Sequence, residues 1–160
     1  MRSFRVLLSL TLVVAMTTGA WAVLPMAIPD FKVNGVEPHL GAAVGEVLRT
    51  KLASVSGLSL VVVDKNHRIQ AGSEQRIGSS GLVDPATAAA VGKAVGARYI
   101  LIGSVNGLGG EISLESRLVD VDTGSVVQSF SVSSDTGDEG VFEAAKYLAD
   151  DVKAALVGSS

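Results

Sequence analysis

The sequence predicts one α/β domain: a mixed sheet of about five strands flanked by three or four helices, in the order β-α-β-(α)-α-β-β-β-α. Three observations predict this fold. An amphipathic segment followed by a valine-rich run is typical of a right-handed parallel β-α-β unit. Glycine-rich turns between alternating segments indicate antiparallel hairpins. A second helical apolar stripe near the end of the chain supplies a helix to cover the sheet.

The front half of the chain contains the parallel unit. Apolar alternation predicts a first strand at residues 26–33, and Pro29 suggests that it lies at an edge or a strand end. Apolar residues recur at helical spacing over residues 39–54, after Pro38, so this segment is predicted to be a helix. The run at residues 58–64 predicts a strand covered on both faces.

The middle of the chain begins with a polar segment. We expect a short helix at residues 66–77 and a loop at residues 78–81. Asp84 and Pro85 are a typical N-cap and first helical residue, so a helix is predicted at residues 86–95, with Gly96 ending it.

The back half predicts a meander of strands followed by one helix. The strands are expected at residues 98–105, 112–120 and 125–133, the turns at 106–110 and 122–124, and the helix at 141–156. Arg117 and Asp120 are a predicted charge pair on the second of these strands. The scattered aromatic residues are expected to anchor the core: Phe31, Tyr99, Phe130, Phe142 and Tyr147.

The N-terminus has the three parts of a secretory signal peptide. Arg2 and Arg5 precede an apolar run at residues 6–16, and Ala20 and Ala22 form an A-x-A cleavage pattern. The alternative is an uncleaved anchor, but the run is shorter than the roughly 20 apolar residues that span a bilayer. We therefore expect residues 1–22 to be cleaved, leaving a periplasmic domain at 23–157, with no membrane span, and a tail at 158–160.

Composition excludes several classes of function. The chain has no cysteine, which excludes disulfides, thiolate metal sites and thiol catalysis, and predicts that the protein is not a lipoprotein. Acidic residues outnumber basic ones by 16 to 13, and no basic run occurs. Nucleic acids and anionic membrane surfaces are therefore poor partners.

No residue pattern predicts a metal or cofactor site. His39 and His67 lack partners at metal-ligand spacing, and the glycine clusters lack the sequence context of phosphate-binding loops. Asp120, Asp122 and Thr123 form a turn sequence more readily than a calcium loop. A hydrolase using Asp64, Asp120 or a serine is a remote alternative, since no nucleophile–base set is visible. We expect no catalytic residues and no cofactor.

Four segments within residues 26–156 carry a family resemblance: MAIPDFKVNG, LSLVVVDKNHRIQAGSEQ, DPATAAAVGKAVGARYILIGSV and LESRLVDVDTGSVV. Together they resemble the CsgG-like family and its relatives, which include the curli secretion channel subunit, the LpoB penicillin-binding protein activator and the TolB amino-terminal domain. The residues that carry the family pattern in a structural role are Phe31, Asp84, Gly92, Gly96, Ala97, Tyr99, Gly103, Ser104, Arg117, Asp120, Thr123 and Gly124.

The resemblance implies a non-catalytic periplasmic domain in envelope assembly or secretion, as a curli-type transport accessory that binds partner proteins through its sheet edge and loops. The alternative is an LpoB-like activator of a cell-wall synthase. The expected partners are thus an outer-membrane secretion or assembly component or a synthase, with self-association as a further option. Channel-forming members carry a lipid-anchoring cysteine and long hairpins, which this sequence lacks, so no pore is expected.

Overall fold

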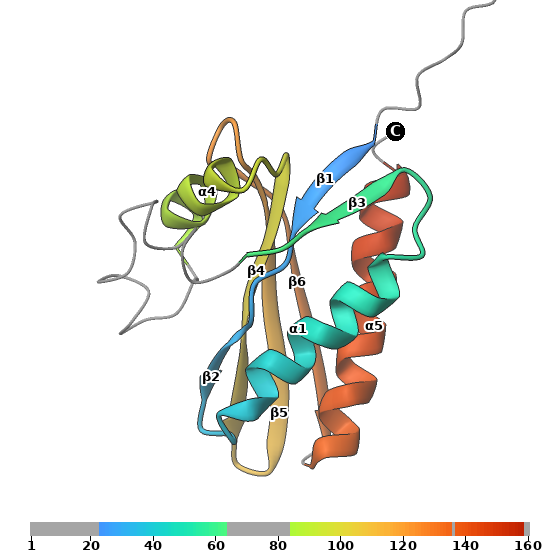
Figure 1. Ribbon diagram of the computed structural model, residues 1–160. Helices are drawn as coiled ribbons and strands as arrows, with labels where there is room; N and C mark the ends of the chain where they lie inside the picture. The colour runs from blue at the N-terminus through green and yellow to red at the C-terminus, as the bar shows by residue number, and fades with distance from the viewer. Residues whose placement is uncertain (1–22, 64–83, 136, 159–160) are drawn as a thin grey trace, which may run out of the picture.

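The computed structural model describes residues 23–63, 84–135 and 137–158, which form a mixed six-stranded sheet and three helices (Figure 1). This confirms the predicted α/β class. The predicted signal peptide, the helix at 66–77, the loop at 78–81 and the last two residues lie outside the described residues. The elements are β1 (Leu24–Ala27), β2 (Lys32–Asn34), α1 (His39–Leu52), β3 (Leu58–Val61), α4 (Pro85–Ala94), β4 (Tyr99–Leu108), β5 (Glu111–Asp120), β6 (Val126–Asp135) and α5 (Asp138–Gly158).

The sheet is parallel at one end and antiparallel at the other. Its order is β3-β1-β4-β5-β6, and β2 pairs with β4 farther along the same edge that β1 uses. β1 and β3 are parallel and are joined through α1, as the predicted crossover requires. β4, β5 and β6 form an antiparallel meander. The back of the chain thus contributes the three longest strands.

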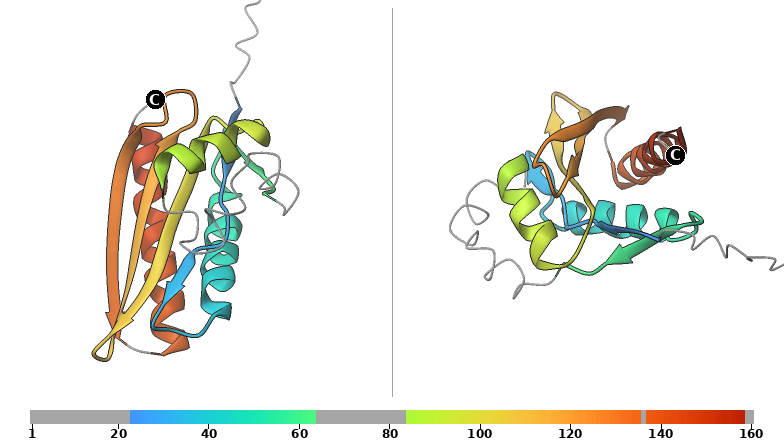
Figure 2. Two further views of the ribbon diagram at one scale, coloured as in Figure 1. Left: turned by 90° about the vertical axis from the view of Figure 1, so that its left-hand side faces the viewer. Right: turned by 90° about the horizontal axis from the view of Figure 1, so that it is seen from above.

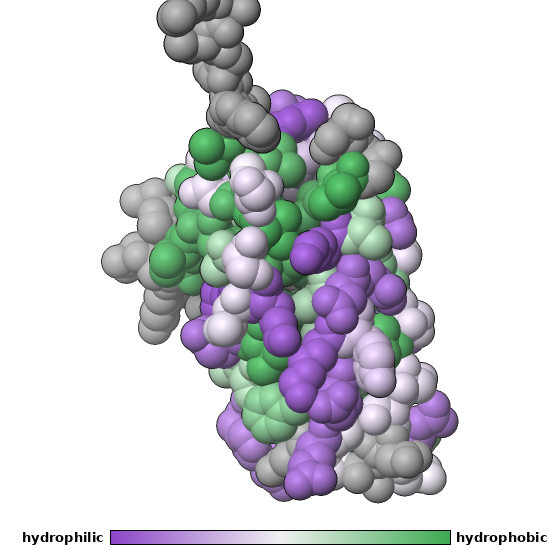
Figure 3. Space-filling view, turned by 90° about the vertical axis from the view of Figure 1, so that its right-hand side faces the viewer, coloured by the Kyte–Doolittle hydropathy of each residue, from purple (hydrophilic) through white to green (hydrophobic). Residues whose placement is uncertain are grey.

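The two faces of the sheet are covered unequally (Figures 1 and 2). α1 and α5 pack side by side on one face and enclose the main core with the apolar side chains of β4, β5 and β6. α4 packs on one end of the other face and closes a smaller core. The outer side of α1 and α5 carries a band of hydrophilic residues, as expected of amphipathic helices (Figure 3). Among the described residues, no helix is both long and apolar enough to cross a membrane.

The predicted first strand is wrong in detail, because it is interrupted. β1 ends at Ala27 opposite Ile100, and β2 resumes at Lys32 opposite Ser104, so the chain inserts one extra residue against β4. Pro29, which has no N–H to donate, lies in this break. Of the two positions that Pro29 suggested, the strand end is confirmed and the sheet edge is wrong, because β1 is a central strand between β3 and β4.

Three further expectations are corrected. β3 is one of the two end strands in the sheet order, and Val62 just after it is 75% exposed, so this segment is not covered on both faces. The β4–β5 hairpin closes at Gly109 and Gly110, both with positive φ, so the strands are longer than predicted. Phe142 and Tyr147 are 40% and 62% exposed on α5 and do not anchor the core.

Two glycines occupy positions that disfavour any other residue, each for a different reason. Gly96 has a φ of +73° just after α4. A Cβ at Gly103 would overlap the carbonyl oxygen of Glu115 and the ring of Phe31. The bare backbone of β4 thus makes room for Phe31, which is buried in the main core.

We predict that Gly103→Val destabilises the protein by about 1–3 kcal/mol, because the added side chain overpacks the core against Phe31. Thermal unfolding measures the change. Ser104→Val, one residue along β4 and partly buried on the opposite face, is the matched control. An unchanged melting temperature for Gly103→Val would contradict this packing account.

The start of α4 provides a second prediction. The Asp84 carboxylate accepts hydrogen bonds from the Thr87 backbone N–H at 2.8 Å and from the Thr87 hydroxyl at 2.7 Å. Asp84→Ala is expected to cost about 0.5–2 kcal/mol in urea unfolding, and Asp84→Asn, which keeps an N-cap acceptor, much less. Equal losses for the two variants would show that capping is not the cause.

Candidate binding surface

The part of the sheet that α4 leaves uncovered is polar. Strand alternation and register place one set of side chains from four strands on this face. We call this set the open face. It consists of Lys32 and Asn34 of β2, Ser104 and Asn106 of β4, Ser113, Glu115 and Arg117 of β5, and Ser129, Ser131 and Ser133 of β6.

The open face is organised in cross-strand rows. Neighbouring residues in a row come from adjacent strands, where side chains of one face interact directly. Segments distant in sequence therefore meet on one surface. The rows are Lys32–Ser104–Glu115–Ser131, Asn34–Asn106–Ser113–Ser133 and Ile102–Arg117–Ser129.

Hydrogen bonds hold several of these side chains in place. Asn34 Nδ2 donates to Asn106 Oδ1 at 2.6 Å, and Asn106 Nδ2 donates to Ser104 Oγ at 3.0 Å. On the other side, Ser131 Oγ donates to Glu115 Oε1 at 2.7 Å. A partner that binds here meets side chains that are already ordered, so less conformational entropy is lost on binding.

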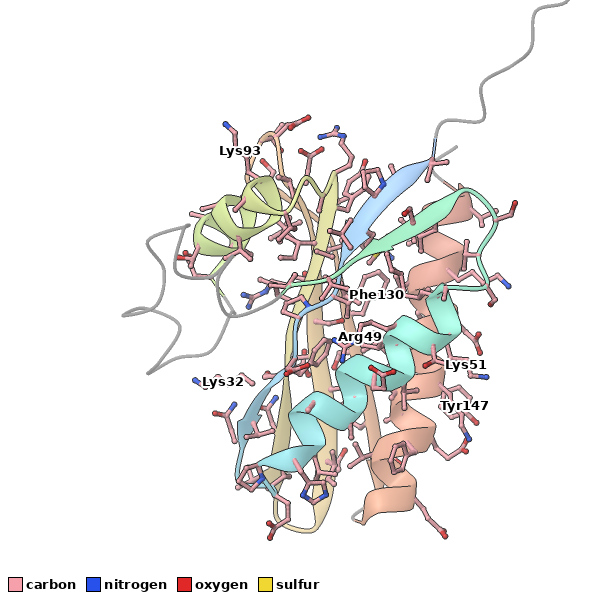
Figure 4. The ribbon with its side chains drawn as sticks, in the orientation of Figure 1. Lys32, Arg49, Lys51, Lys93, Phe130 and Tyr147 are labelled. Carbon is pink, nitrogen blue, oxygen red and sulfur yellow. The ribbon has the colours of Figure 1, made fainter. Side chains whose placement is uncertain are left out.

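A hollow of about 380 Å³ lies in the middle of the open face. Lys32, Glu115 and Arg117 line it together with the hydroxyls of Ser104 and Ser129. Figure 4 shows Lys32 on the side of the molecule opposite Lys51 and Tyr147. Two cations and one carboxylate make the lining of the hollow positively charged, although the whole chain has a net charge of −3.

A second polar cluster closes the β5–β6 turn. Asp120 Oδ1 accepts hydrogen bonds from the backbone N–H of Asp122 at 2.9 Å and of Thr123 at 3.0 Å. Arg98, just before β4, binds both carboxylate oxygens of Asp120 at 2.9 Å and reaches Asp122 at 2.7 Å. Gly124, with a φ of +69°, completes the turn.

This cluster shifts two pKa values, and both shifts favour the charged forms. The hydrogen bond from the Thr123 backbone is the main cause that lowers the pKa of Asp120, and Arg98 lowers it further, against the opposing effect of burial. The hydrogen bond to Asp120 is the main cause that raises the pKa of Arg98. The expected pairing of Arg117 with Asp120 is wrong in that Asp120 pairs with Arg98, because Arg117 points toward the open face.

The other residues of the family pattern belong to the scaffold. Of that set, only Ser104 and Arg117 lie on the open face. Gly92 packs closely against Val121, and Ala97 lies in the smaller core. Tyr99 packs against the main core and lies under the Arg98 guanidinium, which is 5.3 Å from the ring centroid.

Sequence reasoning missed Lys32 as part of this surface. The alternation of residues 112–120 already placed Glu115 and Arg117 on one face, but the β2–β4 register that adds Lys32 has no local signal. Within residues 23–63, 84–135 and 137–158, no group of three or more His, Cys, Asp or Glu residues is placed to hold a metal ion. Asp64 of the hydrolase alternative lies outside these ranges.

Comparison with solved structures identifies similar folds. The LpoB C-terminal domain from Salmonella enterica is 21% identical, with a TM-score of 0.52, over 74% of this chain and 87% of that chain. A PelC dodecamer from Paraburkholderia phytofirmans is 17% identical, with a TM-score of 0.51, over 83% and 87%. TolB from Acinetobacter baumannii is 15% identical, with a TM-score of 0.53, over 85% of this chain and 29% of that chain.

These similarities show the fold and no more, since identity is low. No protein-family model matches the chain, and no curated protein matches it. LpoB and TolB were named by the resemblance in the sequence, and both folds are found again in the structure. The part of that resemblance that pointed to curli components receives no support from these comparisons.

The Asp120 cluster generates a pH prediction. The folded pKa of Asp120 lies below its unfolded value of about 3.9, so its ionised form stabilises the protein above that pH. This contribution is lost as the pH falls through the folded pKa. We expect Asp120→Asn to melt below the wild type at pH 7, with a gap that narrows steadily below pH about 4. Asp150→Asn, exposed on α5, is the control, and a gap that is independent of pH would contradict the assignment.

Proposed function

We propose that this chain is a non-catalytic domain of the bacterial cell envelope that binds a partner protein through its open face, and that the partner is a cell-wall synthase which it activates. The observation that carries the proposal is the ordered, positively charged open face on an otherwise acidic chain. The signal-peptide pattern of residues 1–22 supports export to the periplasm. The likeness to LpoB domains, which belong to activators of this kind, favours this partner over a curli component.

The shape of the open face favours a protein as the partner. Four strands present ten polar side chains over a broad surface, and most of the residues that line the hollow within it are polar or charged. Small-molecule sites are more often deep and largely apolar. Lys32 and Arg117 favour an acidic patch on the partner, because complementary charge speeds association and selects among partners.

A polymerisation assay tests the proposal directly. The purified chain is added to each class A synthase of the same organism, and glycan polymerisation is followed with labelled lipid II. Acceleration of one synthase supports the proposal. No effect on any of them contradicts the choice of a synthase as partner.

Photo-crosslinking in cells tests the surface independently. Probes replace Ser104 and Ser129 on the open face and Lys153 on α5 as a control, and the adducts are identified by mass spectrometry. Adducts to a synthase from the first two sites alone support the proposal. Adducts to an outer-membrane secretion component would favour the curli-type alternative and overturn it.

Charge reversal provides a quantitative prediction. Lys32→Glu combined with Arg117→Glu is expected to weaken partner binding by about tenfold or more, since about 1.4 kcal/mol corresponds to one decade in Kd. Lys51→Glu, on the opposite side of the molecule, is the matched control. Binding is measured by surface plasmon resonance, and circular dichroism checks the fold. If the double variant and Lys51→Glu bind the partner with equal Kd values, the open face is not the binding surface.

A further inference from the structure

The outer edge of β6 lacks most of the features that usually protect an exposed strand, although a β-bulge lies near its start, between the pairs Leu118–Gln128 and Val119–Val126. Proteins blunt such edges with short strands, charged side chains or proline. The edge strand β3 has four residues, and β2 has three, one of them Lys32. β6 has ten residues, and from Val126 to Ser134 it contains no charged residue and no proline.

The β6 edge is also accessible. β6 is the last strand in the sheet order, and the described residues place no strand on its outer side. Val126 and Val127 are 40% and 53% exposed. Figure 2 shows β6 running along the outer edge of the sheet over its whole length, with α5 behind it. Its outward backbone N–H and C=O groups are available to another strand.

We infer that β6 pairs antiparallel with β6 of a second copy of this chain, which forms a two-fold dimer with one continuous sheet. This inference goes beyond the proposed function and does not depend on it. The occupant is a second copy because the uncharged strand meets itself without like-charge repulsion. The dimer would place two open faces side by side on the same surface.

Symmetry limits the register. A two-fold axis normal to the sheet keeps the open faces of both copies on the same side of the joined sheet. One residue of β6 must then lie opposite the same residue of the second copy. The axis at Phe130 places Ser129 opposite Ser131 of the second copy. The row Arg117–Ser129 then continues into Ser131–Glu115 of the second copy, and symmetry repeats this arrangement.

Charge complementarity selects this register over its neighbours. With the axis at Ser129, the Arg117–Ser129 rows of the two copies would face each other, which places like charges in one row. With the axis at Ser131, the Glu115–Ser131 rows would face each other, again with like charges. Of the three registers, only the axis at Phe130 places Arg117 of one copy and Glu115 of the other in the same row, where Glu115 already accepts a hydrogen bond of 2.7 Å from Ser131.

The absence of cysteine from the sequence makes a crosslinking test of this register specific. Chains carrying Ser129→Cys and Ser131→Cys are purified separately with different tags, mixed and oxidised mildly. In the proposed register the two cysteines are directly opposite, at a separation that permits a disulfide. Each variant alone has its cysteines offset by two residues along the strand, about 7 Å, and is expected not to crosslink.

The expected result is a disulfide-linked dimer in the mixture only. Crosslinking of Ser129→Cys alone would overturn the register, and no crosslinking in any sample would overturn the pairing. Either failure leaves the charge-reversal and polymerisation tests of the proposed function unaffected.

Sedimentation analysis tests the dimer without oxidation. The wild type is expected to sediment as a dimer, and Val127→Lys, which places a charge on the edge, to raise its dissociation constant at least tenfold. Val157→Lys, at a valine of similar exposure (62%) on α5, is the matched control and is expected to remain dimeric. A wild type that remains monomeric at every concentration would overturn the inference.

Discussion

The pairing of β4 along both of its edges is the constraint on which the rest of the structure depends. β1 and β2 share one edge, and β5 takes the whole of the other. The break between β1 and β2 brings Phe31 over Gly103, where any larger residue would overlap the ring. This close contact sets the register of the sheet, and the register decides which side chains share a face.

Unequal coverage of the two faces follows from the helices. α1 and α5 carry wide apolar stripes and bury most of one face. α4 has ten residues, five of them alanine, and packs closely through Gly92 over one end of the other face. Among the residues that the structure describes, no other helix covers the rest of this face, and serine, asparagine and charged side chains occupy it. The open face is therefore a consequence of how little α4 covers.

The polar cluster at the β5–β6 turn influences both proposed binding surfaces, the open face and the outer edge of β6. Arg98 and the backbone N–H groups of Asp122 and Thr123 hold Asp120, and these contacts stabilise the turn that leads into β6. A fixed turn sets the register of β6 against β5, and with it the rows of the open face and the position of the outer edge. The stability of the turn and the geometry of the surface thus depend on the same ion pair.

The sequence by itself determined the local structure: Asp84 begins α4, Gly96 follows its end, Asp122 to Gly124 form a turn, and alternation separates the two faces of β5. Capping, turn and alternation signals depend only on residues that are close in the sequence, so a single sequence is enough to recognise them. Tertiary structure alone decided that β1 is central, that Asp120 pairs with Arg98, and that Lys32 joins Glu115 on the open face. These outcomes depend on strand order and register, where a shift of one residue would turn every side chain to the other face.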